Sequence, residues 1–515
     1  MRIKNSLKNM TVIYACTLLI AIMNFVVRRI FLDTLTIDYL GYDGLFTSIF
    51  SYLNLSEMGI ASIITFHMYS EIASHNTEQI RRLLCIYKLI YRAVGIFVLA
   101  AGMIVSIFLP LILAKQELTD SLSFIYTIYY LQLAATLCTY FLAYRRILFV
   151  THERIYVCTA VDTAINIISV ITRMVILLTL RNYILYLIVA IIANVASNLI
   201  ISWYSRKEYP EITPIKVGRE DIRRLNLFKD AGNMMATKIA GTIYGASDDI
   251  IITVMLGVEM TGIVSNYRMI SSKLQELIIS AFSSIQASIG NLVYDKETDR
   301  GIPFFYALDL AGFFLAIVSA TGVMSVCQEL ILLWLHKEDL LLPYAFVILL
   351  SLNLFIAIQN NPMNYFRNSL GHFETDRNYM IVAAVTNVAL SVILGLTMGI
   401  TGVIAATVVG HLFIFMGRCV VVYKYYIKES PIRYYVTTLI RILLLCAAVI
   451  LTNLIGNLIR PYIKNALLFF LIKGFLSVII STTIFVLANV RSDAFKTLCE
   501  YVRKVFGMIF RRKTS

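Results

Sequence analysis

Long apolar stretches separated by short polar gaps dominate this chain. A hydrocarbon core of about 30 Å is crossed by roughly 20 apolar residues in a helix. The stretch from Asn9 to Val27 meets that length and lies between Lys8 and Arg28 without an internal charge. Thirteen further stretches follow near residues 42–70, 83–113, 121–144, 155–180, 183–204, 233–256, 262–292, 303–335, 341–366, 379–398, 400–423, 434–458 and 466–490. The pattern predicts an all-α integral membrane protein with about 14 transmembrane helices.

Basic residues gather in every second gap, and this predicts the orientation. Lys and Arg number 29 in the N-terminus, the alternate gaps and the C-terminal tail, against five in the opposite gaps. The positive-inside rule assigns the richer set to the cytoplasm. Both termini are therefore expected in the cytoplasm, which agrees with an even number of spans. The first stretch has no cleavage site of small residues and is expected to stay as a helix.

Composition narrows the class of protein. Hydrophobic residues make up 59% and charged residues 15% of the chain, whereas soluble chains are about 25% charged. The net charge of +14 follows from the cytoplasmic gaps, so we expect no nucleic-acid partner. The eight cysteines are isolated and form no spacing that suits zinc. No P-loop sequence is present, which excludes ATP hydrolysis of that type.

The longest cytoplasmic gap predicts the domain organisation. It covers residues 205–229 and separates six stretches from the next six. We expect an N-terminal lobe (1–204), this linker, a C-terminal lobe (230–424), two extra helices (425–490) and a basic amphipathic tail (491–515) on the inner leaflet. A faint internal echo links the segments that begin at Leu40 and Leu256, each with a glycine next. It indicates parallel repeats.

Polar residues recur on single faces of several stretches, which indicates a protected or water-filled interior. The clearest stripe is Asp162, Asn166, Ser169 and Arg173, with spacings of four, three and four residues. Interhelical hydrogen bonds are the alternative explanation for the uncharged positions. Cations outnumber acids within the stretches, and arginine suits phosphate because its planar fork makes two parallel hydrogen bonds. A cationic interior beside Asn, Gln and Tyr favours an amphiphilic anion with a diphosphate and a sugar head.

Two segments resemble a known family. The run from Arg28 to Ile64 (RRIFLDTLTIDYLGYDGLFTSIFSYLNLSEMGIASII) is similar to the first two helices of Wzx-type bacterial polysaccharide flippases. The run DDIIITVMLGVEMTGIVSNY is similar to their seventh-span segment. These flippases belong to the multidrug/oligosaccharidyl-lipid/polysaccharide exporter superfamily. The resemblance implies two six-helix lobes in a V, as in MATE transporters, and alternating access for undecaprenyl-diphosphate-linked oligosaccharide repeat units destined for capsule, exopolysaccharide or O-antigen.

The resemblance also implies roles for individual residues. Arginines in the first and eighth helices of related flippases hold the diphosphate, which assigns this role to Arg28 or Arg29 and to Arg268. The polar interior residues are expected to line the glycan path: Gln132, Asn166, Arg173, Asn360 and Asn364. A proton or Na⁺ could be bound by one of four carboxylates, of which Asp249 and Glu57 are preferred over Asp162 and Asp248. Transport driven by the membrane potential alone stays an alternative, and no other cofactor is expected.

Three alternatives to this hypothesis remain. A multidrug cation antiporter of the same superfamily would need an acidic, aromatic interior. A peptidoglycan-precursor flippase usually has an acidic neighbour beside its first-helix arginine, where this chain has Arg29. A polymerase or ligase would need a long outer loop, and every outer gap is short, so we expect no enzyme. Membrane lipids, a polysaccharide polymerase and glycosyltransferases are the expected partners in a bacterial cytoplasmic membrane.

Overall fold

The described part of the molecule is entirely helical. The computed structural model describes residues 2–54, 60–114, 120–215, 217–218, 227–283, 289, 301–370 and 373–511, and no strand occurs in these ranges. Among the described residues, eleven helical segments are long and apolar enough to cross a membrane. The all-α membrane class is therefore confirmed, and the number of fourteen spans stays a prediction.

The contacts divide the chain into two compact units, residues 1–265 and 266–515. The first unit holds α1 to α10 and the start of α11. Its helices are α1 (Arg2–Thr34), α2 (Asp38–Leu53), α3 (Ile60–Ala73), α4 (Thr77–Ile112), α5 (Leu122–Leu142), η2 (Ala143–Arg145), α6 (Arg146–Thr151), α7 (Ile155–Thr179), α8 (Tyr183–Glu208), α10 (Leu227–Leu256) and α11 (Val258–Ser283). The predicted domain boundaries, with lobes on either side of 205–229, stay a prediction.

The second unit contains the rest of α11 and the remaining helices. These are α13 (Gly301–Leu335), η3 (Glu338–Leu340), α14 (Tyr344–Gln359), α15 (Asn361–Leu370), α16 (Phe373–Met398), α17 (Ile400–Val422), η4 (Tyr423–Ile427), α18 (Ile432–Ile459), η5 (Arg460–Tyr462), α19 (Ala466–Asn489) and α20 (Asp493–Arg511). The predicted span 341–366 is divided at Asn360, because Pro362 in the first turn of α15 cannot donate a backbone hydrogen bond to α14.

Polar residues in the gaps begin several of these helices. The side chains of Ser121, Asn182 and Asn465 accept hydrogen bonds from backbone N–H groups three residues ahead, at the starts of α5, α8 and α19. Such caps satisfy donors that the first helical turn leaves without partners. The short gaps therefore carry the signals that separate one span from the next.

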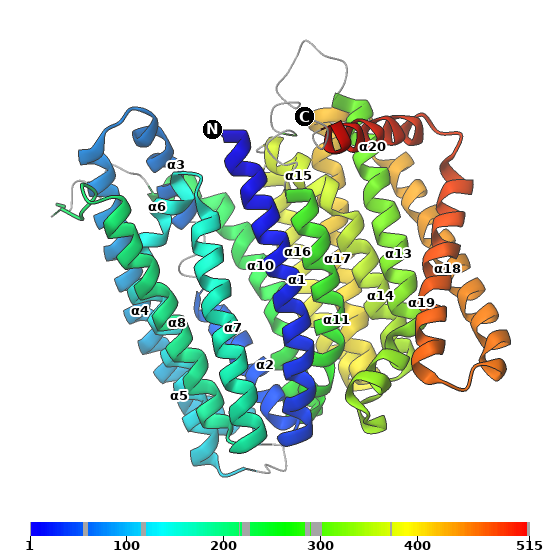
Figure 1. Cartoon of the computed structure of the whole chain (residues 1–515), viewed down its shortest axis with the longest axis horizontal. Coiled ribbons are helices and arrows are strands. Elements are labelled where there is room, and N and C mark those ends of the chain that lie inside the picture. Colours follow the sequence, from blue (N-terminus) through cyan, green and yellow to red (C-terminus); the bar gives the residue numbers. More distant parts are fainter. Residues whose placement is uncertain are drawn as a thin grey trace. The chain divides into compact units, whose positions relative to one another are not determined.

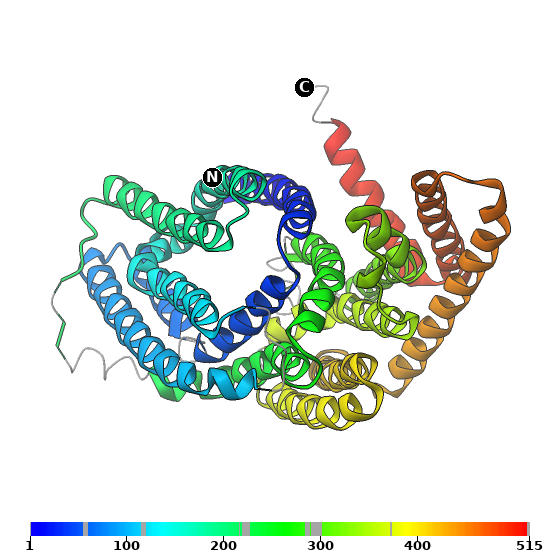
Figure 2. The same cartoon turned by 90° about the horizontal axis from the view of Figure 1, so that it is seen from below.

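In the first unit the helices surround a central space. Helix α1 packs against α7, α7 against α8, α8 against α5, and α5 against α4, while α2 packs against α10. Viewed along the helices, the segments from α1 to α8 form a ring (Figure 2). On α7, Ile168, Ile171, Val175 and Leu178 are 52–62% exposed and form the outer, apolar face. The polar stripe lies on the other face of this helix.

Two glycines allow α2 and the start of α11 to touch backbone to backbone. A Cβ atom added to Gly41 would lie 2.0 Å from the carbonyl oxygen of Val258. A Cβ atom added to Gly262 would lie 2.5 Å from the carbonyl oxygen of Ile37. The two segments that echo one another in the sequence therefore meet in the first unit, and any larger residue at either glycine would separate them.

In the second unit, α13 is the central helix. It packs against α14, α18, α19 and α20. Helix α20 crosses the end of α13 (Figure 1), where Tyr501 packs edge-on against Phe304 at 5.3 Å between ring centroids. The tail expected at 491–515 is thus helical over most of its length, with one side against its own unit.

Candidate functional site

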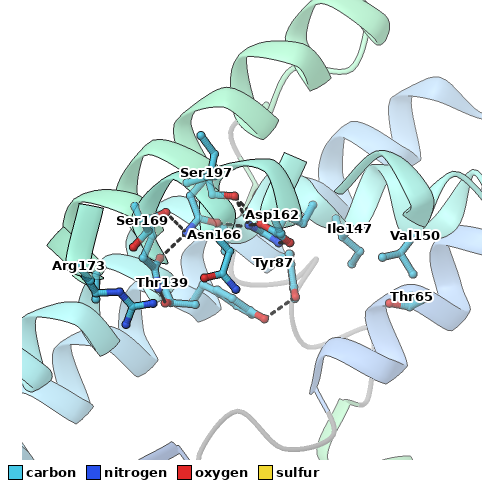
Figure 3. A pocket seen from close by; sticks show the side chains of 18 residues that line it. Thr65, Tyr87, Thr139, Ile147, Val150, Asp162, Asn166, Ser169, Arg173 and Ser197 are labelled. Carbon is cyan, nitrogen blue, oxygen red and sulfur yellow. Dashed lines mark hydrogen bonds and ion pairs between the residues drawn. The ribbon is translucent and has the colours of Figure 1, made fainter. Parts of the chain in front are cut away.

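A cavity of about 610 Å³ lies inside the first unit (Figure 3). Residues of α3, α4, α5, α6, α7 and α8 line it. Although these helices expose apolar side chains on their outer surface, the cavity wall contains two arginines, an aspartate and three asparagines: Arg146, Arg173, Asp162, Asn166, Asn194 and Asn198. Polar groups of this kind are costly next to lipid, so the cavity is the part of the unit suited to a polar ligand.

The α7 stripe forms one side of this cavity. Asp162, Asn166, Ser169 and Arg173 all line it, as expected from their common helical face. With a rise of about 1.5 Å per residue, the stripe extends over roughly 16 Å along the helix. One helix therefore presents a negative, two neutral and a positive side chain in order along the cavity.

A network of charged hydrogen bonds holds the Asp162 end of the stripe. Arg146 donates from Nη1 and Nη2 to the two carboxylate oxygens of Asp162, both at 2.7 Å. Its Nε donates to Asn198 Oδ1 at 2.8 Å, and Ser197 donates to Asp162. Bidentate pairs of this type fix both partners in orientation. Arg146 and Asp162 thus neutralise one another and form a rigid polar wall.

The side chains at the Arg173 end of the stripe make fewer hydrogen bonds. Arg173 Nη1 donates to the Tyr186 hydroxyl at 3.3 Å, and its guanidinium lies 4.9 Å from the centre of the same ring. Its Nε has no hydrogen-bond partner among the described residues. The side-chain amide of Asn166, which also lines the cavity, makes no hydrogen bond to any of the described residues. Both side chains can therefore bond to a ligand in the cavity.

A second cavity of about 300 Å³ lies next to the first, and Ala190 lines both. It is lined by Asp43, Thr47, Asn54, Gln132 and Thr136 among others. Gln132 Nε2 donates to Asp43 Oδ1 at 2.9 Å. The Asp43 side chain is solvent-accessible although protein surrounds it, because its open side faces this cavity.

The two adjacent arginines of α1 lie differently. Arg28 donates from Nη1 to Ser265 Oγ at 3.1 Å and lies within electrostatic range of Asp43. Arg29 donates from Nε to Asp33 Oδ2 at 3.4 Å, one turn along the same helix, with both side chains more than a third exposed. Arg28 is therefore linked electrostatically to Asp43, a residue of the second cavity.

The other predicted site residues are distributed over both units. Asp248 is buried, and Asp249 accepts a hydrogen bond from Ser48 Oγ at 3.2 Å on the α2–α10 contact. Arg268 lies half-buried in the second unit. Asn360 is 1% exposed, and neither atom of its amide is hydrogen-bonded within the described residues. Asn364 accepts from Arg367 at 3.4 Å, and Glu57 lies outside the described residues.

Sequence reasoning missed several cavity residues. Asp43 stands within the glycine-flanked segment that carries the resemblance, but it was not expected to line the path. Arg146 follows the apolar stretch 121–144, and the charge pattern alone places it among the cytoplasmic basic residues. Asn194 and Asn198 are four residues apart on α8, and this spacing was a signal that could have found them. No group of His, Cys, Asp or Glu that could hold a metal ion occurs among the described residues.

Comparisons with known proteins agree with this architecture. A family model described as "Polysaccharide biosynthesis protein" matches residues 6–285. The structure is similar to the lipid II flippase MurJ in an inward closed conformation, with a TM-score of 0.67 and 14% identity over 93% of this chain and 100% of that chain. No curated protein sequence matches the chain.

Two MATE transporters share the fold at a similarly low sequence identity. An inward-facing multidrug resistance MATE transporter of the MOP superfamily gives a TM-score of 0.61 at 12% identity, over 79% of this chain and 98% of its own. The MATE transporter VcmN of Vibrio cholerae gives 0.56 at 12% identity, over 83% of this chain and 98% of its own. At such low identity these similarities show the fold alone.

Proposed function

We propose that this chain, which belongs to the polysaccharide biosynthesis protein family, is a flippase for lipid-linked oligosaccharides. Its cargo would be an undecaprenyl-diphosphate-linked oligosaccharide repeat unit, moved from the cytoplasmic to the outer leaflet for polysaccharide export. The cavity of the first unit is the observation that carries this proposal. It combines about 610 Å³ of space with a wall of arginine, aspartate and asparagine side chains inside an apolar exterior.

The glycan and the lipid require opposite surroundings. Sugar hydroxyls exchange hydrogen bonds with water for bonds with Asn, Gln and charged groups, and the cavities offer Asn166, Asn194 and Gln132 for this purpose. The polyprenyl chain needs no such partners and can remain among the exposed apolar side chains of the helices. The head thus crosses the membrane in the protein while the tail stays in the bilayer.

The diphosphate is assigned to arginines. Arg28 is the preferred residue of α1, because Arg29 pairs with Asp33. Following the family resemblance, we include Arg268 as a headgroup residue, and we include Asn360 and Asn364 on the glycan path. Movement of one charge across 100 mV changes the free energy by about 2.3 kcal/mol, so export of an anion from a cell that is negative inside is downhill.

A coupling ion would act on one of the carboxylates. Asp162 is already neutralised by Arg146, which leaves Asp249 and Glu57 as the preferred groups for a proton or Na⁺. The protein would work in the bacterial cytoplasmic membrane with both termini in the cytoplasm. Glycosyltransferases would supply the cargo and a polymerase would consume it.

Reconstitution tests the function directly. Purified protein in liposomes should move a fluorescent undecaprenyl-diphosphate-linked oligosaccharide between leaflets, as measured by quenching with a membrane-impermeant reductant. Movement of a peptidoglycan precursor alone, or efflux of cationic drugs alone, would replace the proposal by the corresponding alternative. Arg268→Ala should abolish movement while the protein remains folded in the membrane, and wild-type rates would contradict the role of Arg268.

A further inference from the structure

We propose that Arg173 of α7 is a further headgroup arginine, which binds a pyrophosphate together with Arg28 at the cavity. The inference rests on the proposed function, in that a pyrophosphate headgroup is the cargo's anionic part. It differs from the sequence expectation, which assigned the diphosphate to Arg28 or Arg29 together with Arg268 and placed Arg173 on the glycan path. The shared chemistry is a pyrophosphate, whether free or attached to a polyprenyl chain.

Aromatic contacts bring α1 and α8 together beside Arg173. Phe31, one turn after Arg28 on α1, packs edge-on against Tyr183 at 5.7 Å and Tyr186 at 5.5 Å between ring centroids. Tyr186 is also the residue that accepts from Arg173 and supports its guanidinium. Electrostatic interactions link this tyrosine with Arg28 as well as with Arg173. The two arginines therefore approach one cluster from different helices.

Both guanidinium groups keep most of their donors for a ligand. Each arginine carries five N–H donors in a planar fork. Among the described residues, Arg28 donates one side-chain hydrogen bond, to Ser265, and Arg173 donates one, to Tyr186. Neither arginine forms an ion pair in that part of the chain. Arg146, by contrast, is committed to Asp162 and Asn198.

One carboxylate interacts electrostatically with both arginines. Asp43 is within electrostatic range of Arg28 and Arg173, while its Oδ1 is held by Gln132 at 2.9 Å. Arg28, Arg173 and Asp43 together carry one excess positive charge when all three groups are ionised, and Asp249 acts electrostatically on Asp43. A pyrophosphate, with its two phosphoryl groups, matches two separate arginine forks better than this carboxylate does. Asp43 would then oppose the bound anion.

This arrangement predicts substitutions with opposite effects. Full-length protein in detergent is titrated with inorganic pyrophosphate, undecaprenyl diphosphate or undecaprenyl monophosphate, and binding is followed by the shift of the thermal unfolding midpoint. Arg173→Ala should weaken pyrophosphate and undecaprenyl diphosphate binding at least tenfold. Asp43→Asn should tighten both about threefold or more, because it removes a like charge from the site. Arg29→Ala is the matched control and should bind within twofold of wild type.

The ligands and variants separate the possible failures. A two-arginine site is supported if inorganic pyrophosphate and undecaprenyl diphosphate bind tightly and undecaprenyl monophosphate binds more weakly. Equal binding of all three ligands overturns it. Arg173→Lys keeps the charge without the fork and should fall between wild type and alanine, which distinguishes loss of binding from loss of folding. Wild-type affinity in Arg173→Ala, or unchanged affinity in Asp43→Asn, overturns the inference. Intact pyrophosphate binding without any flipping of lipid-linked oligosaccharide would refute the proposed function and leave the site standing.

Discussion

The charged residues of the two units occupy different environments. In the first unit, the side chains of Arg146 and Asp162 are 29% and 41% exposed and face a cavity. In the second unit, Arg441 and Asp309 form a pair with the same shortest distance, 2.7 Å, but are only 9% and 2% exposed. The same pair of residue types thus lines a space in one unit and closes a core in the other.

The second-unit pair is part of a closed network. Asp309 on α13 also accepts hydrogen bonds from Tyr434 and, at 2.9 Å, from Gln359. Farther along α13, Lys473 of α19 donates to Glu329 at 2.6 Å. The two ion pairs attach α18 and α19 to the same helix, α13. These charged residues connect helices to one another. A count of intramembrane cations in the sequence does not distinguish such cations from cations that face a ligand.

The largest expected effect follows from breaking the closed pair. Arg441→Ala leaves Asp309 without its cation, and we expect a loss of about 3–5 kcal/mol in the free energy of unfolding. The thermal unfolding midpoint of purified protein measures it, with Arg146→Ala as the comparison. Equal losses in the two variants would remove the distinction between a core pair and a cavity pair.

A smaller effect is expected at the backbone contact of the first unit. Gly41→Ala places a methyl group where the Val258 carbonyl lies, and such overpacking costs about 1–3 kcal/mol. Gly245→Ala on α10 is the matched control, because no atom lies within 4 Å of its added Cβ. The control should be neutral or stabilising by up to about 1 kcal/mol. A neutral Gly41→Ala would show that α2 and α11 can separate freely.

The cavity pair should matter more for transport than for folding. Arg146→Ala is expected to reduce stability by about 1 kcal/mol or less, because the pair is partly solvated. It should reduce flipping about tenfold, the equivalent of one charged hydrogen bond among those that orient Asp162 in the cavity wall. Paired measurements of unfolding and of flipping in liposomes test this. A severe folding defect with normal flipping of the remaining protein would reverse the comparison.

The smallest effect is expected at Arg29. Its i, i+4 pair with Asp33 is exposed, and such pairs contribute about 0.3–0.5 kcal/mol. Arg29→Ala should therefore unfold and flip as wild type does. A loss of flipping comparable to that of Arg28→Ala would restore the adjacent arginines as a joint headgroup site.

Several of these features could be predicted from residue spacing. The α7 stripe follows from one helix alone, since residues three and four apart share a face, and all four stripe residues do line the cavity. Asp43 could not be assigned in the same way. It stands alone among apolar and glycine neighbours on α2, and its partner Gln132 is 89 residues away. No local pattern connects the two.

The sequence by itself determined the membrane class, the helical composition and the polar face of α7, because hydropathy and periodicity are properties of a single segment. Only the tertiary structure decided that Arg28 interacts with Asp43 while Arg29 pairs with Asp33, and that Arg441 closes a core while Arg173 keeps free donors. The reason is physical: the surroundings of a charge are set by groups on other helices, and the chain's linear order does not record which of them come within a few ångströms.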